Sequence, residues 1–374
     1  MNGPQGLKGL TKKSVLIRSD LIWLGLSKME LKRHGTFRHC IETIQVLLSQ
    51  GCSVRVLFAI GNPFLPNSSV CMRTVCQALA TALECPVDYV PVSELAKKEL
   101  KLGSIQLTDD ACISEGEKNV SQRLVQQWLQ KIDAIVLVSL NNWDTHYAST
   151  KGLKNSGVPL YLGKSLQSFD YWIKTLPGKK IGLLLGGSQV ASQLDLAKGL
   201  SSNLAYVGLG HVFLSACFSE HVFDALFDQS VVDALNQLSL DKKNVLYPYE
   251  VVVYDEALCR SRICVIHDIG PNEQVKDICL RTVDQIIDRI KEDVDVVICA
   301  GVLGQYSDPR FARGTDLVLQ ALAQSKSETV LVGKDIISAA VLLGLSDQFD
   351  YLIEGTEVER ALISGVVSED SCVI

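Results

Sequence analysis

The residues of this chain best suited to hold a phosphate lie in three glycine-containing turns. Gly186-Gly187 and Gly301 each follow a short apolar run, and a third run, residues 329–332, ends in Gly333-Lys334-Asp335. In parallel α/β folds, such turns join a strand to a helix whose free N–H groups can bind phosphate. These turns carry few glycines, however, and unsuitable side chains surround them. The pattern therefore predicts a nucleotide-type frame from which much of the chemistry has been removed.

The amino-acid composition limits the classes of function that this chain can have. The chain has 374 residues, a 47% hydrophobic share and a formal net charge of -6, so it is large enough for two cores and gives no sign of a nucleic-acid partner. Its twelve cysteines are scattered and form no Cys-x-x-Cys pair, which favours reduced thiols over a metal site. No signal peptide or run of ~18 apolar residues occurs, so we expect no membrane insertion and a cytoplasmic location.

Short apolar runs alternate with amphipathic stretches along most of the chain. We expect strands at residues 14–17, 54–58, 134–138, 180–185, 296–300 and 329–332, and helices at residues 38–50, 70–83, 120–131 and 164–176. Alternating strands and helices of this kind are typical of parallel sheets covered by helices on both faces. The sequence thus predicts two α/β domains joined by a helix.

The order of four motifs resembles that of the phosphoglycerate kinase family over nearly the full length. The motifs occupy residues 183–187, 247–255, 268–271 and 311–315, the last being Phe-Ala-Arg-Gly-Thr. The resemblance implies two Rossmann-like three-layer domains, with a phosphorylated acid bound to the first and Mg-nucleotide to the second. It places the N-terminal domain at residues 1–163, the interdomain helix at 164–177, the C-terminal domain at 178–355 and a C-terminal segment at 356–374.

The family's substrate-binding cations are largely replaced in this chain. The Arg-x-Asp-x-Asn motif appears as residues 18–22, so Asp20 remains while the substrate asparagine becomes Ile22. Of the family's arginines in two later loops, one falls near Cys112 and the other on Thr145, and the family's His-Leu-Gly-Arg-Pro turn has become Ala-Ile-Gly-Asn-Pro. Arg38 is the one candidate to survive as a substrate cation. We therefore expect Asp20 and Arg38 to be degenerate remnants of the substrate site.

The nucleotide side is altered in a similar way. The resemblance implies degenerate remnants of a nucleotide site at Gly186, Gly187, Gly301, Lys334 and Asp335. Residues that contact nucleotide or phosphate in the family are replaced by Gln189, Gln193, Ser307 and Glu357. Asp335 has a second interpretation, because an aspartate that follows a strand often caps the next helix.

The free energies of the missing contacts favour an inactive protein. A charge-assisted hydrogen bond contributes roughly 1.5–3 kcal/mol, so losing four or five would remove on the order of 6–15 kcal/mol. A small acid bound at high-micromolar affinity has only ~5–7 kcal/mol in total. We therefore expect a pseudoenzyme with no catalytic residues, no bound metal and no cofactor.

The expected role is that of a structural or scaffolding component that binds other proteins in a cytoskeletal or other large assembly. Two alternatives stay open: a regulatory module that keeps MgATP or MgADP through Lys334 and Asp335, and a residual phosphoglycerate kinase. An exposed apolar patch would favour the scaffold, and a bound nucleotide would favour the regulatory module.

Overall fold

The computed structural model describes residues 6–21, 35–62, 65–66, 71–140, 145–213, 233, 235–238 and 240–353. Ile22, Glu357 and the C-terminal segment 356–374 lie outside the described residues. The chain divides into two compact units, the first running to Trp172 and the second beginning at Ile173. The division falls within helix α5, which spans Lys164–Ile173.

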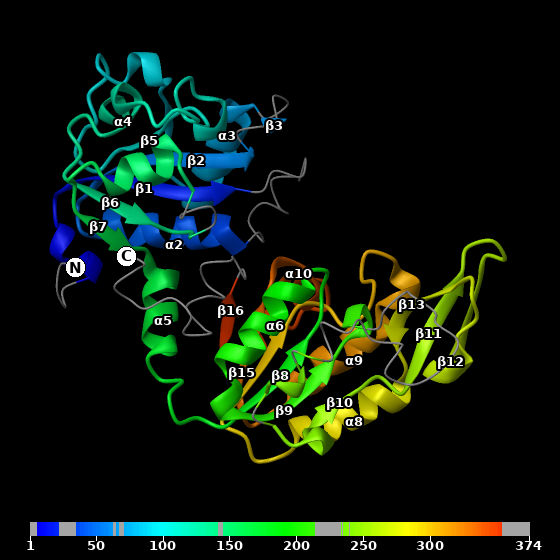
Figure 1. Ribbon diagram of the computed structural model, residues 1–374. Coiled ribbons are helices and arrows are strands. Elements are labelled where there is room, and N and C mark those ends of the chain that lie inside the picture. The colour runs from blue at the N-terminus through cyan, green and yellow to red at the C-terminus, as the bar shows by residue number, and fades with distance from the viewer. Residues whose placement is uncertain are drawn as a thin grey trace. The chain divides into compact units, whose positions relative to one another are not determined.

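The first unit is built on one mostly parallel sheet with the strand order β4-β5-β2-β1-β6-β7, to which β3 adds an antiparallel pairing with β2 (Figure 1). Its strands are β1 (Ser14–Leu21), β2 (Ser53–Asn62), β3 (Leu65–Pro66), β4 (Asp88–Tyr89), β5 (Ile105–Leu107), β6 (Ala134–Leu137) and β7 (Leu160–Leu162). Its α-helices are α2 (Gly35–Ser49), α3 (Met72–Leu83) and α4 (Gln122–Trp128), and η4 (Ala148–Gly152) is a short π-helix.

The two faces of this sheet differ in chemistry. Val15 and Ile17 of β1 join a core formed with residues of α2 and α3, including Phe37 and Leu79. Since successive strand residues point to opposite faces, Arg18 and Asp20 lie on the other face of β1. The strand therefore packs an apolar core on one side and carries two buried charged groups on the other.

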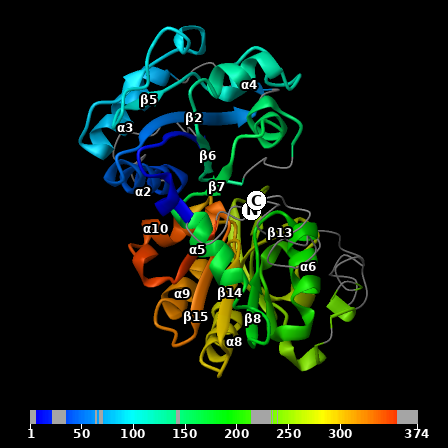
Figure 2. The same ribbon diagram turned by 90° about the vertical axis from the view of Figure 1, so that its left-hand side faces the viewer.

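The second unit contains a parallel sheet with the order β10-β9-β8-β14-β15-β16, seen in Figure 2. Its strands are β8 (Ile181–Leu185), β9 (Leu204–Leu209), β10 (Val245–Leu246), β14 (Val296–Ala300), β15 (Glu328–Val332) and β16 (Tyr351–Ile353). The helices are α6 (Val190–Gly199), α8 (Leu280–Ile290), α9 (Arg313–Leu322) and α10 (Lys334–Leu342). Helices α8, α9 and α10 share one apolar core with β14 and β15.

Helix α8 illustrates how the sequence specifies this packing. Val283, Ile286 and Ile290 recur at helical spacing and are buried, while the residues between them are mostly exposed. Such a stripe places one face of a helix against a sheet. A separate antiparallel sheet with the order β12-β11-β13 precedes α8, and its strands are β11 (Glu250–Asp255), β12 (Arg260–Val265) and β13 (Glu273–Ile278).

The fold class predicted from the sequence is confirmed: each unit holds a parallel sheet with helices packed on it. The strands and helices expected from the apolar periodicity are all present, with their ends shifted by a few residues. None of the cysteines within the described ranges takes part in a disulfide. Among the described residues, no helix has both the length and the apolar character needed to cross a bilayer.

Candidate functional site

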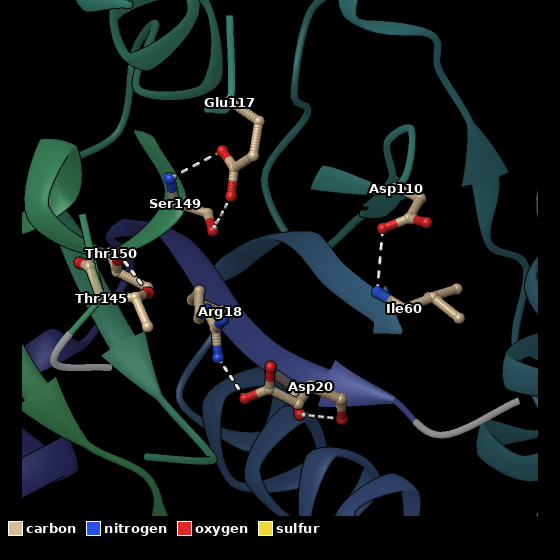
Figure 3. A network of polar contacts seen from close by, with 9 residues as sticks. Arg18, Asp20, Ile60, Asp110, Glu117, Thr145, Ser149 and Thr150 are labelled. Carbon is tan, nitrogen blue, oxygen red and sulfur yellow. Dashed lines mark hydrogen bonds and ion pairs between the residues drawn. The ribbon is translucent and has the colours of Figure 1, made fainter. Parts of the chain in front are cut away.

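A cluster of buried charged groups lies at the carboxyl end of the first unit's sheet. It consists of Arg18, Asp20, Asp110 and Glu117, which we call the carboxylate cluster, and each is at most 4% exposed. Figure 3 shows these groups around the ends of β1 and β2. The carboxyl ends of parallel strands are where α/β proteins usually bind ligands, so this is the candidate substrate end of the unit.

Arg18 and Asp20 form an ion pair within β1. The Arg18 guanidinium donates to the Asp20 carboxylate, and the two side chains share one face because they are two residues apart. Asp20, which the sequence suggested as a substrate remnant, is therefore held by a neighbour in its own strand. The pairing draws the positive charge of Arg18 toward a protein carboxylate, where it contributes less to binding an external anion.

Asp110 joins the end of β2 to the loop after β5. Its Oδ1 accepts hydrogen bonds from the backbone N–H groups of Ile60 and Cys112, each at 2.9 Å. Burial raises the pKa of Asp110 to about 6, and these two hydrogen bonds only partly offset the effect. Burial also raises the pKa of the Cys112 thiol, which additionally feels the negative charges of Asp110 and Glu117. Cys112 thus occupies, as a neutral thiol, a position where the resemblance implies an arginine.

Glu117 fixes the start of the π-helix η4. It accepts hydrogen bonds from the Ser149 backbone N–H at 3.0 Å and from the Ser149 hydroxyl at 2.5 Å. Burial raises the pKa of Glu117, while the bonds from Ser149 and the charge of Arg18 lower it. Nearby, the Thr150 hydroxyl donates to the Thr145 carbonyl at 2.7 Å. Hydroxyl hydrogen bonds of Ser149 and Thr150 therefore hold the loop in which the resemblance implies a substrate arginine.

Arg38, the other suggested substrate remnant, is paired inside its own helix. Its Nε lies 3.9 Å from Oε1 of Glu42, one turn further along α2, and Lys164 approaches the second oxygen of Glu42 at the same distance. These distances are those of ion pairs rather than hydrogen bonds. Arg38 thus forms an ion pair with Glu42 on the surface of α2.

The carboxylate cluster carries three carboxylates for one guanidinium. A phosphorylated acid brings further negative charge, which these carboxylates oppose and for which Arg18 is the one cation of the carboxylate cluster. Within the described ranges, no three His, Cys, Asp or Glu side chains are grouped so as to hold a metal ion. Most of the carboxylate oxygens described at this end accept from Arg18, from Ser149 or from backbone N–H groups.

The glycine turns of the second unit are packed against one another. The N–H of Gly186 donates to the Ala300 carbonyl at 2.8 Å, that of Gly187 to Val302 at 2.7 Å, and that of Gly301 to Val332 at 2.9 Å. A Cβ added at Gly186 would lie 2.2 Å from the Val302 carbonyl oxygen. Close backbone approach therefore requires glycine at positions 186 and 301, a positive φ favours it at 187, and these N–H groups are already used within the protein.

Lys334 and Asp335 begin helix α10. The N-cap residue of this helix is Gly333, with φ 120°, so the interpretation of Asp335 as the cap is wrong. Asp335 is exposed in the first turn and Lys334 is half-buried. A carboxylate in the first turn of a helix complements the partial positive charge of the helix N-terminus. It therefore lowers the attraction of that N-terminus for an external phosphate.

Gln193 stands in helix α6 where the resemblance implies a lysine. It is 4% exposed, and its Oε1 has no hydrogen-bond partner among the described residues. Gln189, the second such position, is exposed at the N-cap of the same helix. Both side chains are uncharged, so α6 carries no cation at the two positions where the resemblance implies lysines.

Sequence reasoning missed Asp277, which organises the core of the second unit. Its two carboxylate oxygens accept from the backbone N–H groups of Ile278 at 2.8 Å and Gly314 at 2.9 Å, and burial raises its pKa to about 7. The motif at residues 268–271, by contrast, lies in the connection between β12 and β13. The available signal was an aspartate three residues before the amphipathic helix α8, close to where a helix start often carries one. No comparable sequence pattern pointed to Glu117.

The comparisons with known proteins identify first the architecture and then the family. Phosphoglycerate kinase from Coxiella burnetii matches with a TM-score of 0.73 and 20% identity, covering 96% of this chain and 95% of that chain. The enzyme from Pyrococcus horikoshii OT3 matches with a TM-score of 0.75 and 19% identity, covering 95% and 94%. The two units thus define a phosphoglycerate-kinase-like fold. The family model for phosphoglycerate kinase matches residues 7–365, and the chain belongs to this family.

Proposed function

We propose that this member of the phosphoglycerate kinase family does not transfer phosphate and acts as a structural or scaffolding component in a cytoplasmic protein assembly. The observation that carries the proposal is the carboxylate cluster, in which Arg18 is paired with Asp20 while Asp110 and Glu117 add further buried carboxyl groups. Phosphoryl transfer depends mainly on positioning and on neutralising negative charge. This end of the sheet supplies little of the second requirement.

The second unit supports the same proposal from backbone geometry. The N–H groups of Gly186 and Gly301 bond to carbonyls at the ends of β14 and β15, and that of Gly187 to the Val302 carbonyl, so three donors that could face a phosphate are used within the fold. The described residues nonetheless form an apolar core against each sheet. A chain that keeps its packing while its ligand donors are redirected suits a role in which the shape of the protein is used.

Residual phosphoglycerate kinase activity is the second candidate, and family membership across residues 7–365 favours it. It requires cations that the carboxylate cluster does not supply. The third candidate, a regulatory nucleotide module, depends on Lys334, which is half-buried at the start of α10 beside the exposed Asp335. Both alternatives predict nucleotide binding, and only the former predicts turnover.

A coupled assay for phosphoryl transfer between ATP and 3-phosphoglycerate tests the proposal. We expect no turnover above the blank in either direction, at protein concentrations far above those used for active kinases. An Asp335→Ala variant is the control for contaminating enzyme, because a contaminant is unaffected by that substitution. Turnover that tracks the purified chain and disappears in the variant would establish a residual kinase and overturn the proposal.

A further inference from the structure

The antiparallel sheet of the second unit leaves one strand edge open. In the order β12-β11-β13, strand β12 pairs only with β11. The outer side of β13 is occupied, since the Gln305 N–H donates to the Lys276 carbonyl at 2.7 Å. Within the described part of the chain, no backbone bond to the outer side of β12 is found. An open strand edge is a template for pairing with another strand.

The register identifies which backbone groups face outward. The Ile266 N–H donates to the Tyr249 carbonyl at 3.1 Å, so residues 266 and 249 form a hydrogen-bonded pair. Hydrogen-bonded and non-hydrogen-bonded pairs alternate along an antiparallel ladder. With Val252 opposite Ile263, the non-hydrogen-bonded residues of β12 are therefore Ser261, Ile263 and Val265. Their N–H and C=O groups point away from β11, toward the open edge.

The side chains along this edge are also accessible. Ile263 is 58% exposed and is the central residue of the three. Charged side chains often protect open edges, but Arg262 is held on its own sheet: its guanidinium donates to both oxygens of Glu273 at 2.6 Å and to the Asp268 carbonyl at 2.6 Å. The edge thus presents an apolar residue at its centre, an arginine held by its own sheet and, at the start of the strand, the exposed Arg260.

We propose that β12 pairs with β12 of a second copy of this chain, antiparallel and about a two-fold axis through Ile263. In this register Ile263 lies opposite its counterpart, and Ser261 lies opposite Val265, so all three outward-facing residues of each strand find partners. Arg262 lies opposite Cys264 and Arg260 opposite Ile266, so no two arginines face each other.

The other symmetric registers are less favourable. Centring the axis on Ser261 sets Arg260 directly opposite Arg262, and like charges in that position destabilise a sheet. Centring it on Arg262 sets that arginine opposite its own counterpart. Centring it on Cys264 or on Val265 places Ser261 or Ile263, respectively, opposite His267, which belongs to the 3-10 helix η9 (Ile266–Asp268) and not to a strand. Self-complementarity of charge and of hydrogen bonding therefore selects the Ile263 register and a second copy as the occupant. The contact lies in one unit and does not depend on whether the chain is catalytic.

Sedimentation equilibrium of the full chain tests the pairing between about 1 µM and about 100 µM, the range in which so small a contact should dissociate. We expect the weight-average mass to rise from monomer toward dimer. Ile263→Pro should weaken dimerisation about tenfold or more, because proline removes an outward N–H and leaves the ladder to β11 intact. Ile263→Val is the matched control and should dimerise like the parent.

A cysteine scan tests the register independently. In a background with Cys71, Cys217, Cys259 and Cys372 replaced by serine, Ile263→Cys should form an intermolecular disulfide on mild oxidation, because hydrogen-bonded pairs have Cα atoms about 5.5 Å apart. Ser261→Cys should not, since its counterpart would lie several residues away. A chain that stays monomeric at every concentration, a dimer unaffected by Ile263→Pro, or equal cross-linking at both positions would overturn the proposal.

Discussion

Polar groups at the carboxyl ends of the two sheets are bonded within the protein in different ways. In the first unit, side chains make the contacts: Arg18 pairs with Asp20, and Asp110 and Glu117 accept hydrogen bonds from backbone N–H groups. In the second unit, the backbone satisfies itself, because the N–H groups of Gly186 and its neighbouring turns donate to adjacent carbonyls. Polar groups at the end of a parallel sheet can therefore be bonded by side chains in one unit and by the backbone in the other.

The largest effect should come from breaking the ion pair of the first unit. Arg18→Met leaves the Asp20 carboxylate buried without its partner and should lower the free energy of unfolding by about 3–5 kcal/mol. The double variant Arg18→Met, Asp20→Leu should recover most of this loss, because it removes both charges. Urea unfolding of the three proteins measures the difference. A double variant as unstable as the single variant would show that Asp20 is not the main partner of Arg18.

In the second unit, Gly186→Ala should lower the free energy of unfolding by on the order of 3 kcal/mol, because the new Cβ would meet the Val302 carbonyl oxygen at 2.2 Å. Gly187→Ala is the control: its Cβ has ordinary contacts, so only its φ of 73° costs energy, about 1–2 kcal/mol. Urea unfolding compares the two. Equal losses would contradict the packing of the turns described here.

Asp110 should make stability depend on pH. Its pKa is raised from 3.8 to about 6 in the folded chain, so the folded state favours the protonated carboxyl. Its contribution is present below about pH 4 and is lost as pH rises through about 6, on the order of 3 kcal/mol in all. Asp110→Asn keeps an acceptor for Ile60 and Cys112, so its stability relative to the parent should rise between pH 4 and 7. Urea unfolding at several pH values measures this.

Asp277→Asn is the matched comparison from the second unit. The pKa of Asp277 is raised further, to about 7, but both of its oxygens accept backbone N–H groups. An amide can accept only one of them, so the gain at neutral pH should be smaller than for Asp110→Asn. A larger gain would mean that burial of the charge outweighs the hydrogen bonds at this position.

The smallest effect is expected at Asp335. Because the side chain is exposed in the first turn of α10, Asp335→Ala should change the free energy of unfolding by less than about 1 kcal/mol, mainly through the helix dipole. Thermal or urea unfolding with and without Mg²⁺ measures it. A loss that appears only with Mg²⁺ would reveal a bound ion and would favour the nucleotide module.

The sequence predicted the fold because apolar periodicity is a local property, and runs such as residues 296–300 are recognisable as buried strands by composition alone. The ion pair of Arg18 and Asp20 was within reach, since two charges two residues apart in an apolar strand must share a face. Glu117 and Ser149 were not, because they meet through a tertiary contact between segments 32 residues apart. The cap on α10 was misassigned because Gly333, with its positive φ, takes the place expected for Asp335.

The most direct test of the central claim is a calorimetric titration of the purified, folded chain with 3-phosphoglycerate, with and without MgADP. The carboxylate cluster predicts no saturable heat with 3-phosphoglycerate under either condition, because one paired guanidinium stands among three carboxyl groups. Saturable binding of 3-phosphoglycerate at one molecule per chain, abolished by Arg18→Met in a variant shown to be folded, would contradict the account and identify a working substrate site.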